Sequence, residues 1–113
     1  MSHDRAFLGH MLQALERVST LTAEISEDDL ATDWRKQNAL IRELEVLGEA
    51  AGRVSTDFVA AHSEIPWKEI TGLRHKLIHD YFDVDLQIVW NTATINVPAI
   101  LPLVSTAFES LDE

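Results

Sequence analysis

The chain has 113 residues, 46% of them hydrophobic and 25% charged, which is enough apolar material for one core but not for two. We therefore expect a single folded domain over residues 1–113, and the lack of cysteine excludes disulfides and thiolate metal sites. The net charge of −10 argues against a protein that coats nucleic acid through a broad basic face, but it permits a local site that grips one or two phosphates.

Apolar residues recur with helical spacing along the whole chain, which predicts an all-α antiparallel bundle of four to six helices. The first helix is expected over residues 3–23. A short second helix should begin at Ser26, because Ser26 and Asp29 resemble a capping box with aspartate in place of the usual glutamate. The apolar stripe of the first helix consists of Phe7, Leu8, Met11, Leu12, Leu15, Val18 and Leu21.

The longest helix is expected over residues 33–54, with an apolar face and an opposite charged face. Gly48 lies between these faces, where a glycine costs about 1 kcal/mol relative to alanine. We expect another backbone to approach closely at Gly48; the alternative is a tolerated glycine without a packing role. The apolar face carries Leu40, Leu44, Leu47, Ala51 and Val54, and the charged face carries Arg42, Glu45, Glu49 and Arg53.

A further helix is predicted over residues 66–79, because Pro66 suits a first helical turn. Its core stripe is Ile70, Leu73 and Leu77, with Trp67, Arg74 and Ile78 beside the stripe and His75 and His79 facing away. Trp67 and Ile78 would form a second apolar strip that a monomer leaves wet. We therefore expect this strip to meet a second copy of the chain.

The last long helix should start at Asp83-Val84-Asp85, since acidic residues suit a first turn. Its stripe is Leu86, Val89, Trp90, Ala93 and Val97, and Pro98 and Pro102 are expected to kink or restart it. No apolar run approaches the roughly 20 residues of a membrane span, and no secretory signal opens the chain. We therefore expect a cytoplasmic protein without a membrane partner.

The candidate chemistry lies in Arg74, His79 and Tyr81. A guanidinium suits phosphate oxygens, and a histidine exchanges protons near neutral pH. This pair is sufficient for metal-free RNA cleavage, in which a base takes the proton of a ribose 2′-OH and the arginine stabilises the charged phosphate. The same residues also fit a plain helix cap and dipole partner.

Two metal-site patterns are weaker. His75 and His79 have the spacing of a helical zinc pair, but a third ligand such as Asp80 or Asp83 would be needed, and no glutamate follows the first histidine. Asp83 and Asp85 resemble paired metal-binding carboxylates, but a helix cap explains them better. We predict no metal and no cofactor.

The motif residues also carry a resemblance. Arg74, His79 and Tyr81 fit the R-x(4–6)-H-x-Y signature of HEPN domains, and the flanking blocks are similar to the HepT-like branch of that superfamily. The likeness extends over about residues 4–110. The flanking blocks are Leu44-Glu45-x-x-Gly48-Glu49-Ala50-Ala51 and Glu64-Ile65-Pro66-Trp67, followed by Ile70, Gly72, Ile78 and Phe82-x-Val84-Asp85.

HepT-like proteins are homodimeric, metal-independent endoribonucleases, the toxins of two-gene toxin–antitoxin modules. The resemblance implies that Arg74 and His79 are the catalytic pair acting on tRNA or mRNA, with His75 and Lys76 as supporting RNA contacts. It also implies that the antitoxin, a minimal nucleotidyltransferase of the MntA type, transfers AMP to Tyr81. The added bulk and negative charge would fill a cleft shared by two protomers.

Two other readings stay open. The domain could serve a nucleotidyltransferase as a non-catalytic HEPN adaptor or nucleotide-binding subunit. Alternatively, the cluster around Arg74 and His79 is a polar patch at a dimer interface.

Overall fold

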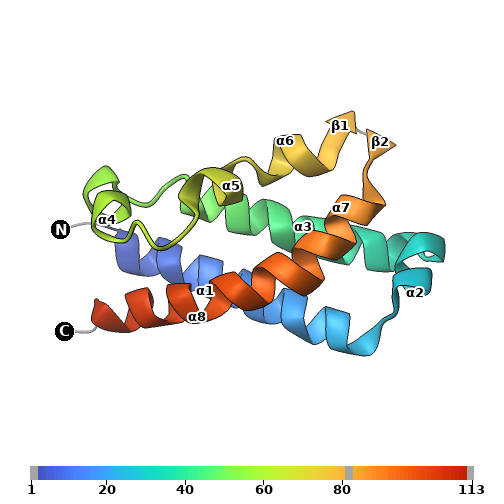
Figure 1. Ribbon diagram of the computed structural model, residues 1–113, viewed down its shortest axis with the longest axis horizontal. Coiled ribbons are helices and arrows are strands. Elements are labelled where there is room, and N and C mark those ends of the chain that lie inside the picture. Colours follow the sequence, from blue (N-terminus) through green and yellow to red (C-terminus); the bar gives the residue numbers. More distant parts are fainter. Residues whose placement is uncertain (1–2, 81–82, 112–113) are drawn as a thin grey trace.

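The computed structural model describes residues 3–80 and 83–111, and only the backbone of His79 and Asp80. It is an elongated helical bundle, 44 × 27 × 20 Å, and the predicted all-α class is confirmed (Figure 1). The helices are α1 (Asp4–Glu24), α2 (Glu27–Thr32), α3 (Trp34–Ala51), α4 (Thr56–Ala61), α5 (Trp67–Thr71), α6 (Leu73–Leu77), α7 (Leu86–Asn91), the π-helical turn η1 (Thr92–Asn96) and α8 (Val97–Ser110); the strands are β1 (Ile78–Asp80) and β2 (Asp83–Val84).

The core lies between α1, α3 and the continuous rod formed by α7, η1 and α8. α1 runs along α3 on one side and along α8 on the other, while α5 and α6 lie across α3 (Figure 1). The predicted stripe of α1 is buried at Leu8, Met11, Leu15 and Val18, and its flanking members are half-buried. The apolar face of α3 is buried at Leu40, Leu44, Leu47, Ala51 and the following Val54, as the helical spacing predicts.

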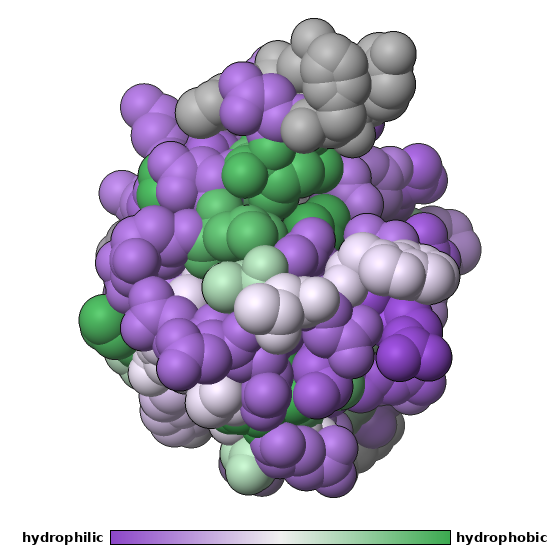
Figure 2. Space-filling view, turned by 90° about the vertical axis from the view of Figure 1, so that its right-hand side faces the viewer, coloured by the Kyte–Doolittle hydropathy of each residue, from purple (hydrophilic) through white to green (hydrophobic). Residues whose placement is uncertain are grey.

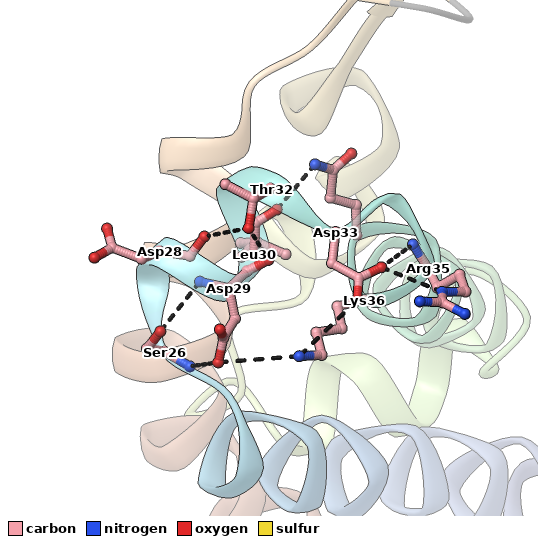
Figure 3. Close-up of polar contacts among 9 residues, drawn as sticks. Ser26, Asp28, Asp29, Leu30, Thr32, Asp33, Arg35 and Lys36 are labelled. Atoms are coloured by element: carbon pink, nitrogen blue, oxygen red, sulfur yellow. Dashed lines mark hydrogen bonds and ion pairs between the residues drawn. The ribbon is translucent and has the colours of Figure 1, made fainter.

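The corner between α1 and α3 is fixed by side-chain caps (Figure 3). Ser26 and Asp29 form the predicted capping box, in which each side chain accepts a hydrogen bond from the other's backbone N–H. The hydrogen bond from the Ser26 backbone, followed by the charge of Lys36, lowers the pKa of Asp29. Asp33 caps α3 by accepting a hydrogen bond from the Arg35 backbone N–H, which lowers the pKa of Asp33.

At Gly48 the backbone of α5 approaches α3 closely. A Cβ at this position would lie 2.9 Å from the carbonyl oxygen of Ile70, closer than real Cβ contacts allow. This confirms the expected close approach of another backbone. The contact sets the spacing between α3 and the segment that carries Arg74.

The helix predicted over residues 66–79 is wrong in two respects. It breaks at Gly72 into α5 and α6, and it ends at Leu77, since Ile78 adopts an extended conformation and pairs with Val84 across a short antiparallel ladder. Glycine is a poor helix former and the β-branched isoleucine favours strands, which fits both departures. The sequence had suggested no strand.

The prediction that Trp67 and Ile78 form an outward apolar strip is also wrong. Trp67 is buried, its ring lies edge-on to Phe58, and its Nε1–H donates to the carbonyl oxygen of His62 at 2.9 Å. Ile78 is half-buried against the core. The chain between α4 and α5 folds back to meet the indole, so this strip no longer supports a dimer.

The last helix begins later than predicted, because Asp83 and Val84 form the strand β2 and α7 starts at Leu86. Asp85 caps α7 by accepting from the Ile88 backbone N–H at 3.1 Å. The π-helical turn η1 comes just before Pro98, which lacks the N–H that a regular helix would use there.

Leu86–Ser110 is a continuous stretch of 25 residues that is long and apolar enough to cross a membrane by length and composition alone. It is longer than the sequence led us to expect. Its buried positions Val89, Ala93, Val97 and Val104 recur every four or seven residues and join the core. The core helix of a bundle has the same properties.

Candidate functional site

Arg74 stands on the outer side of the short helix α6. The buried side chains of Leu73 and Leu77 hold α6 against the bundle, and the Arg74 side chain is 74% exposed. Its Nε donates to the Glu45 carboxylate on α3 at 3.2 Å. The guanidinium is thus oriented by one acidic group and remains open to solvent, as phosphate binding requires.

A groove of about 460 Å³ opens beside Arg74, between α1 and α3. We call it the α1–α3–α6 groove. It combines three guanidinium groups with two carboxylates and a partly apolar floor. Its lining is Phe7, His10, Arg42, Glu45, Val46, Glu49, Ala50, Arg53 and Arg74.

Two other predicted site residues, His75 and Lys76, lie on α6 and do not line this groove. His75 and Lys76 are exposed on α6. Lys76 lines a different cavity of about 270 Å³, formed by α5 and α6 with η1 and α8. Arg74 and Lys76 therefore face two separate hollows of the surface.

His79 lies in β1, two residues beyond the end of α6. It is not on a helix, so the placement of His75 and His79 four residues apart on one helix is wrong. The side chain of His79 and all of Tyr81 lie outside the described residues. Over residues 3–78 and 83–111, whose side chains the structure describes, no three histidine, aspartate or glutamate side chains are grouped to hold a metal ion.

The end of the molecule that carries α2, α7 and the β1–β2 hairpin has an apolar area below the hairpin (Figure 2). Half-buried apolar side chains in this region are Ile78, Val84 and Ile88. Ile78 and Val84 pair across the hairpin, and His79 follows Ile78 in β1.

Reasoning from the sequence missed Phe7 and His10 as neighbours of Arg74. It placed Arg42, Glu45, Glu49 and Arg53 on one outward face, which is the signal that could have indicated a charged groove. That α1 supplies the second wall follows only from how α1 packs on α3.

The chain is similar to proteins whose names describe them as ribonucleases. The family model described as "Ribonuclease HepT-like" matches residues 11–107. "Probable ribonuclease HepT" of Thermococcus cleftensis is 39% identical over 94 residues, which cover 83% of this chain and 86% of that protein. "Putative RNase TTE0752" of Caldanaerobacter subterraneus is 39% identical over 100 residues, which cover 88% of this chain and 89% of that protein.

No solved structure matches the chain. The family match spans most of the helical bundle, including α6 and the hairpin that carry Arg74 and His79. The chain belongs to the HepT-like ribonuclease family.

Proposed function

We propose that this chain is the toxin of a toxin–antitoxin module and acts in the cytoplasm as a homodimeric, metal-independent endoribonuclease on tRNA or mRNA. Membership of a ribonuclease family supports an RNA substrate. The observation that carries the proposal is Arg74, whose guanidinium is exposed beside a groove and oriented by Glu45, five residues before His79.

The proposed chemistry needs only the two motif side chains. His79 takes the proton from the ribose 2′-OH, the 2′-oxygen attacks phosphorus, and the bond to the 5′-oxygen breaks. Arg74 stabilises the extra negative charge of the pentacoordinate phosphate. The departing 5′-oxygen also needs a proton, and a second copy of His79 from the partner subunit would supply it.

The apolar area below the hairpin supports a dimer. Its side chains at Ile78, Val84 and Ile88 are only partly covered within one chain, and they adjoin the strand that carries His79. A second copy that covers this area would bring the two motif segments together in one cleft.

Tyr81 is the proposed point of control. It follows β1 by one residue and lies two residues from His79 in the sequence. AMP transferred to its hydroxyl by an MntA-type nucleotidyltransferase would place bulk and negative charge beside the catalytic pair. RNA would then be repelled from the cleft.

The test is cleavage of single-stranded RNA by purified protein in the presence of EDTA. We expect Arg74→Ala and His79→Ala to abolish cleavage while the dimer persists in size-exclusion chromatography, and the control Arg35→Ala to cleave normally. Equal cleavage by all variants would refute the catalytic assignment. Nucleotide binding by a wild-type dimer that does not cut RNA would favour the adaptor function.

The control step has its own test. Co-expression with the nucleotidyltransferase encoded beside this gene should add mass in AMP steps, which intact-mass spectrometry detects. Tyr81→Phe should remain unmodified and active. Modification of the Tyr81→Phe variant would place the target elsewhere.

A further inference from the structure

The α1–α3–α6 groove concentrates positive charge on an acidic protein. The chain has nine lysine and arginine residues against 19 acidic ones. Three of those nine, Arg42, Arg53 and Arg74, line this groove, and His10 adds a fourth basic side chain. A third of the lysine and arginine residues therefore lie in one groove. Such a group of basic side chains suits a ligand with several negative charges.

Arg53 and Arg74 are each held by an ion pair and still exposed to solvent. A terminal nitrogen of Arg53 lies 3.1 Å from the Glu49 carboxylate, and the Arg53 side chain is 61% exposed. Arg74 is held by Glu45 in the same way and is also exposed. Exposed pairs of this kind contribute at most about 1 kcal/mol, so phosphate oxygens can replace the carboxylates.

Arg42 is the third guanidinium of the groove. Within the part of the chain that the structure describes, it has no hydrogen bond or ion pair. It is therefore ready to bind an anion without breaking a contact.

The second wall of the groove offers an aromatic surface. Phe7 is half-buried and lies edge-on to the exposed His10, with 6.1 Å between the ring centroids. Asp4, at the start of α1, accepts hydrogen bonds from the backbone N–H and the hydroxyl of Ser55 at 2.8 and 2.7 Å. These bonds tie the start of α1 to the turn after α3.

Charged walls, an aromatic side and an apolar floor together match single-stranded RNA. Arginines bind successive phosphates, and unstacked bases pack on aromatic rings. A volume of about 460 Å³ lies within the range of about 300–1,000 Å³ found for ligand sites.

We propose that the α1–α3–α6 groove binds the single-stranded RNA that flanks the cleaved phosphate. Arg42 and Arg53 bind neighbouring phosphates, and Phe7 with His10 receives a base. Arg74 stands at the edge of the groove and joins it to the site of cleavage. This inference rests on the proposed ribonuclease function and adds the path of the substrate.

The test measures binding of a fluorescent 2′-O-methyl RNA oligonucleotide, which lacks the attacking hydroxyl, by anisotropy. We expect Arg42→Gln and Arg53→Gln each to weaken binding about fivefold or more at low salt. Each should reduce the slope of log affinity against log salt by about 0.7, the value for one lost phosphate contact on a single strand. A duplex RNA of the same length should bind more weakly.

The matched control is Arg35→Gln. Like Arg53, Arg35 is an exposed arginine paired with a carboxylate, in this case that of Asp33, the N-cap residue of α3, at 3.4 Å, but it lies outside the groove. Phe7→Leu should weaken binding without changing the salt slope, because it removes stacking and no charge. Thermal unfolding of each variant checks that the fold is retained.

The outcomes separate this inference from the proposed function. If Arg42→Gln and Arg53→Gln bind no more weakly than Arg35→Gln, the groove is not the RNA path, whether or not the wild type cleaves RNA. Equal binding of duplex RNA would overturn the single-stranded assignment. If the groove variants lose binding while the wild type cuts no RNA, the groove stands and the ribonuclease function falls.

Discussion

Glu45 holds the Nε of Arg74 at 3.2 Å across the gap between α3 and α6. The pair leaves the guanidinium accessible, but it also places a negative charge where RNA phosphate is proposed to bind. The carboxylate therefore orients the arginine and competes with the substrate.

Glu45→Gln should raise RNA affinity about two- to threefold, because it removes a repulsive charge and keeps a hydrogen-bond acceptor for Arg74. The free energy of unfolding should change by less than about 1 kcal/mol, since the ion pair is exposed. Anisotropy and urea denaturation measure the two effects. Glu43→Gln, on the same helix and paired with Arg17, is the control. Weaker binding by Glu45→Gln would mean that the carboxylate's orienting role dominates.

Gly48→Ala should lower the free energy of unfolding. The new methyl would meet the Ile70 carbonyl oxygen at 2.9 Å, and overpacking of this kind costs about 1–3 kcal/mol, more than the propensity gain of about 1 kcal/mol. Gly52→Ala is the control, because its Cβ would make only ordinary contacts at 3.6 Å and its backbone is right-handed helical. Chemical denaturation compares them, and equal stability of the two variants would contradict the close approach.

Thr92→Val should stabilise the fold by about 1 kcal/mol. The Thr92 hydroxyl is buried and has no hydrogen-bond partner among the residues that the structure describes. Valine has the same shape without the unsatisfied polar group. Thr94→Val is the control, since the Thr94 hydroxyl donates to the Trp90 carbonyl oxygen at 2.7 Å and its loss should not stabilise. A lower melting temperature for Thr92→Val would indicate a hidden partner, such as water.

The capping box at α2 predicts a dependence of stability on pH. The Ser26 backbone N–H and then Lys36 lower the pKa of Asp29 in the folded state. The stability from this carboxylate is therefore fully present above the unfolded pKa of about 3.9 and is lost as pH falls through the lower folded value. Asp29→Asn should flatten the acid side of the stability–pH curve. Asp28→Asn removes the same charge from the same turn. In this variant the acid side of the stability–pH curve should stay steeper than in Asp29→Asn.

Local spacing was enough to predict the helical class and the buried faces of α1 and α3, because those faces repeat every three or four residues. It failed at Trp67 and Ile78 for a physical reason. The indole N–H of Trp67 donates a hydrogen bond to the His62 carbonyl oxygen, and Ile78 lies in a strand that pairs with Val84. Both contacts depend on chain segments that a helical projection does not contain.

The candidate site could likewise be predicted only in part from the sequence. The motif itself indicated Arg74 and His79, and the charged face of α3 was visible in the sequence. The groove also depends on Phe7 and His10, which precede Arg74 by more than 60 residues in the sequence. Only the packing of α1 on α3 brings these residues to one place.

The break at Gly72 leaves Arg74 on a helix of only five residues. So short a helix has few internal hydrogen bonds, and it is held mainly by Leu73 and Leu77. Segments of this kind open at a lower free energy than the long helices around them. We expect the amide hydrogens of α6 to exchange faster than those of α1 and α3, and to slow when RNA is bound. The segment that carries Arg74, the proposed catalytic arginine, would then become more ordered when RNA binds, while the long helices beneath it stay closed.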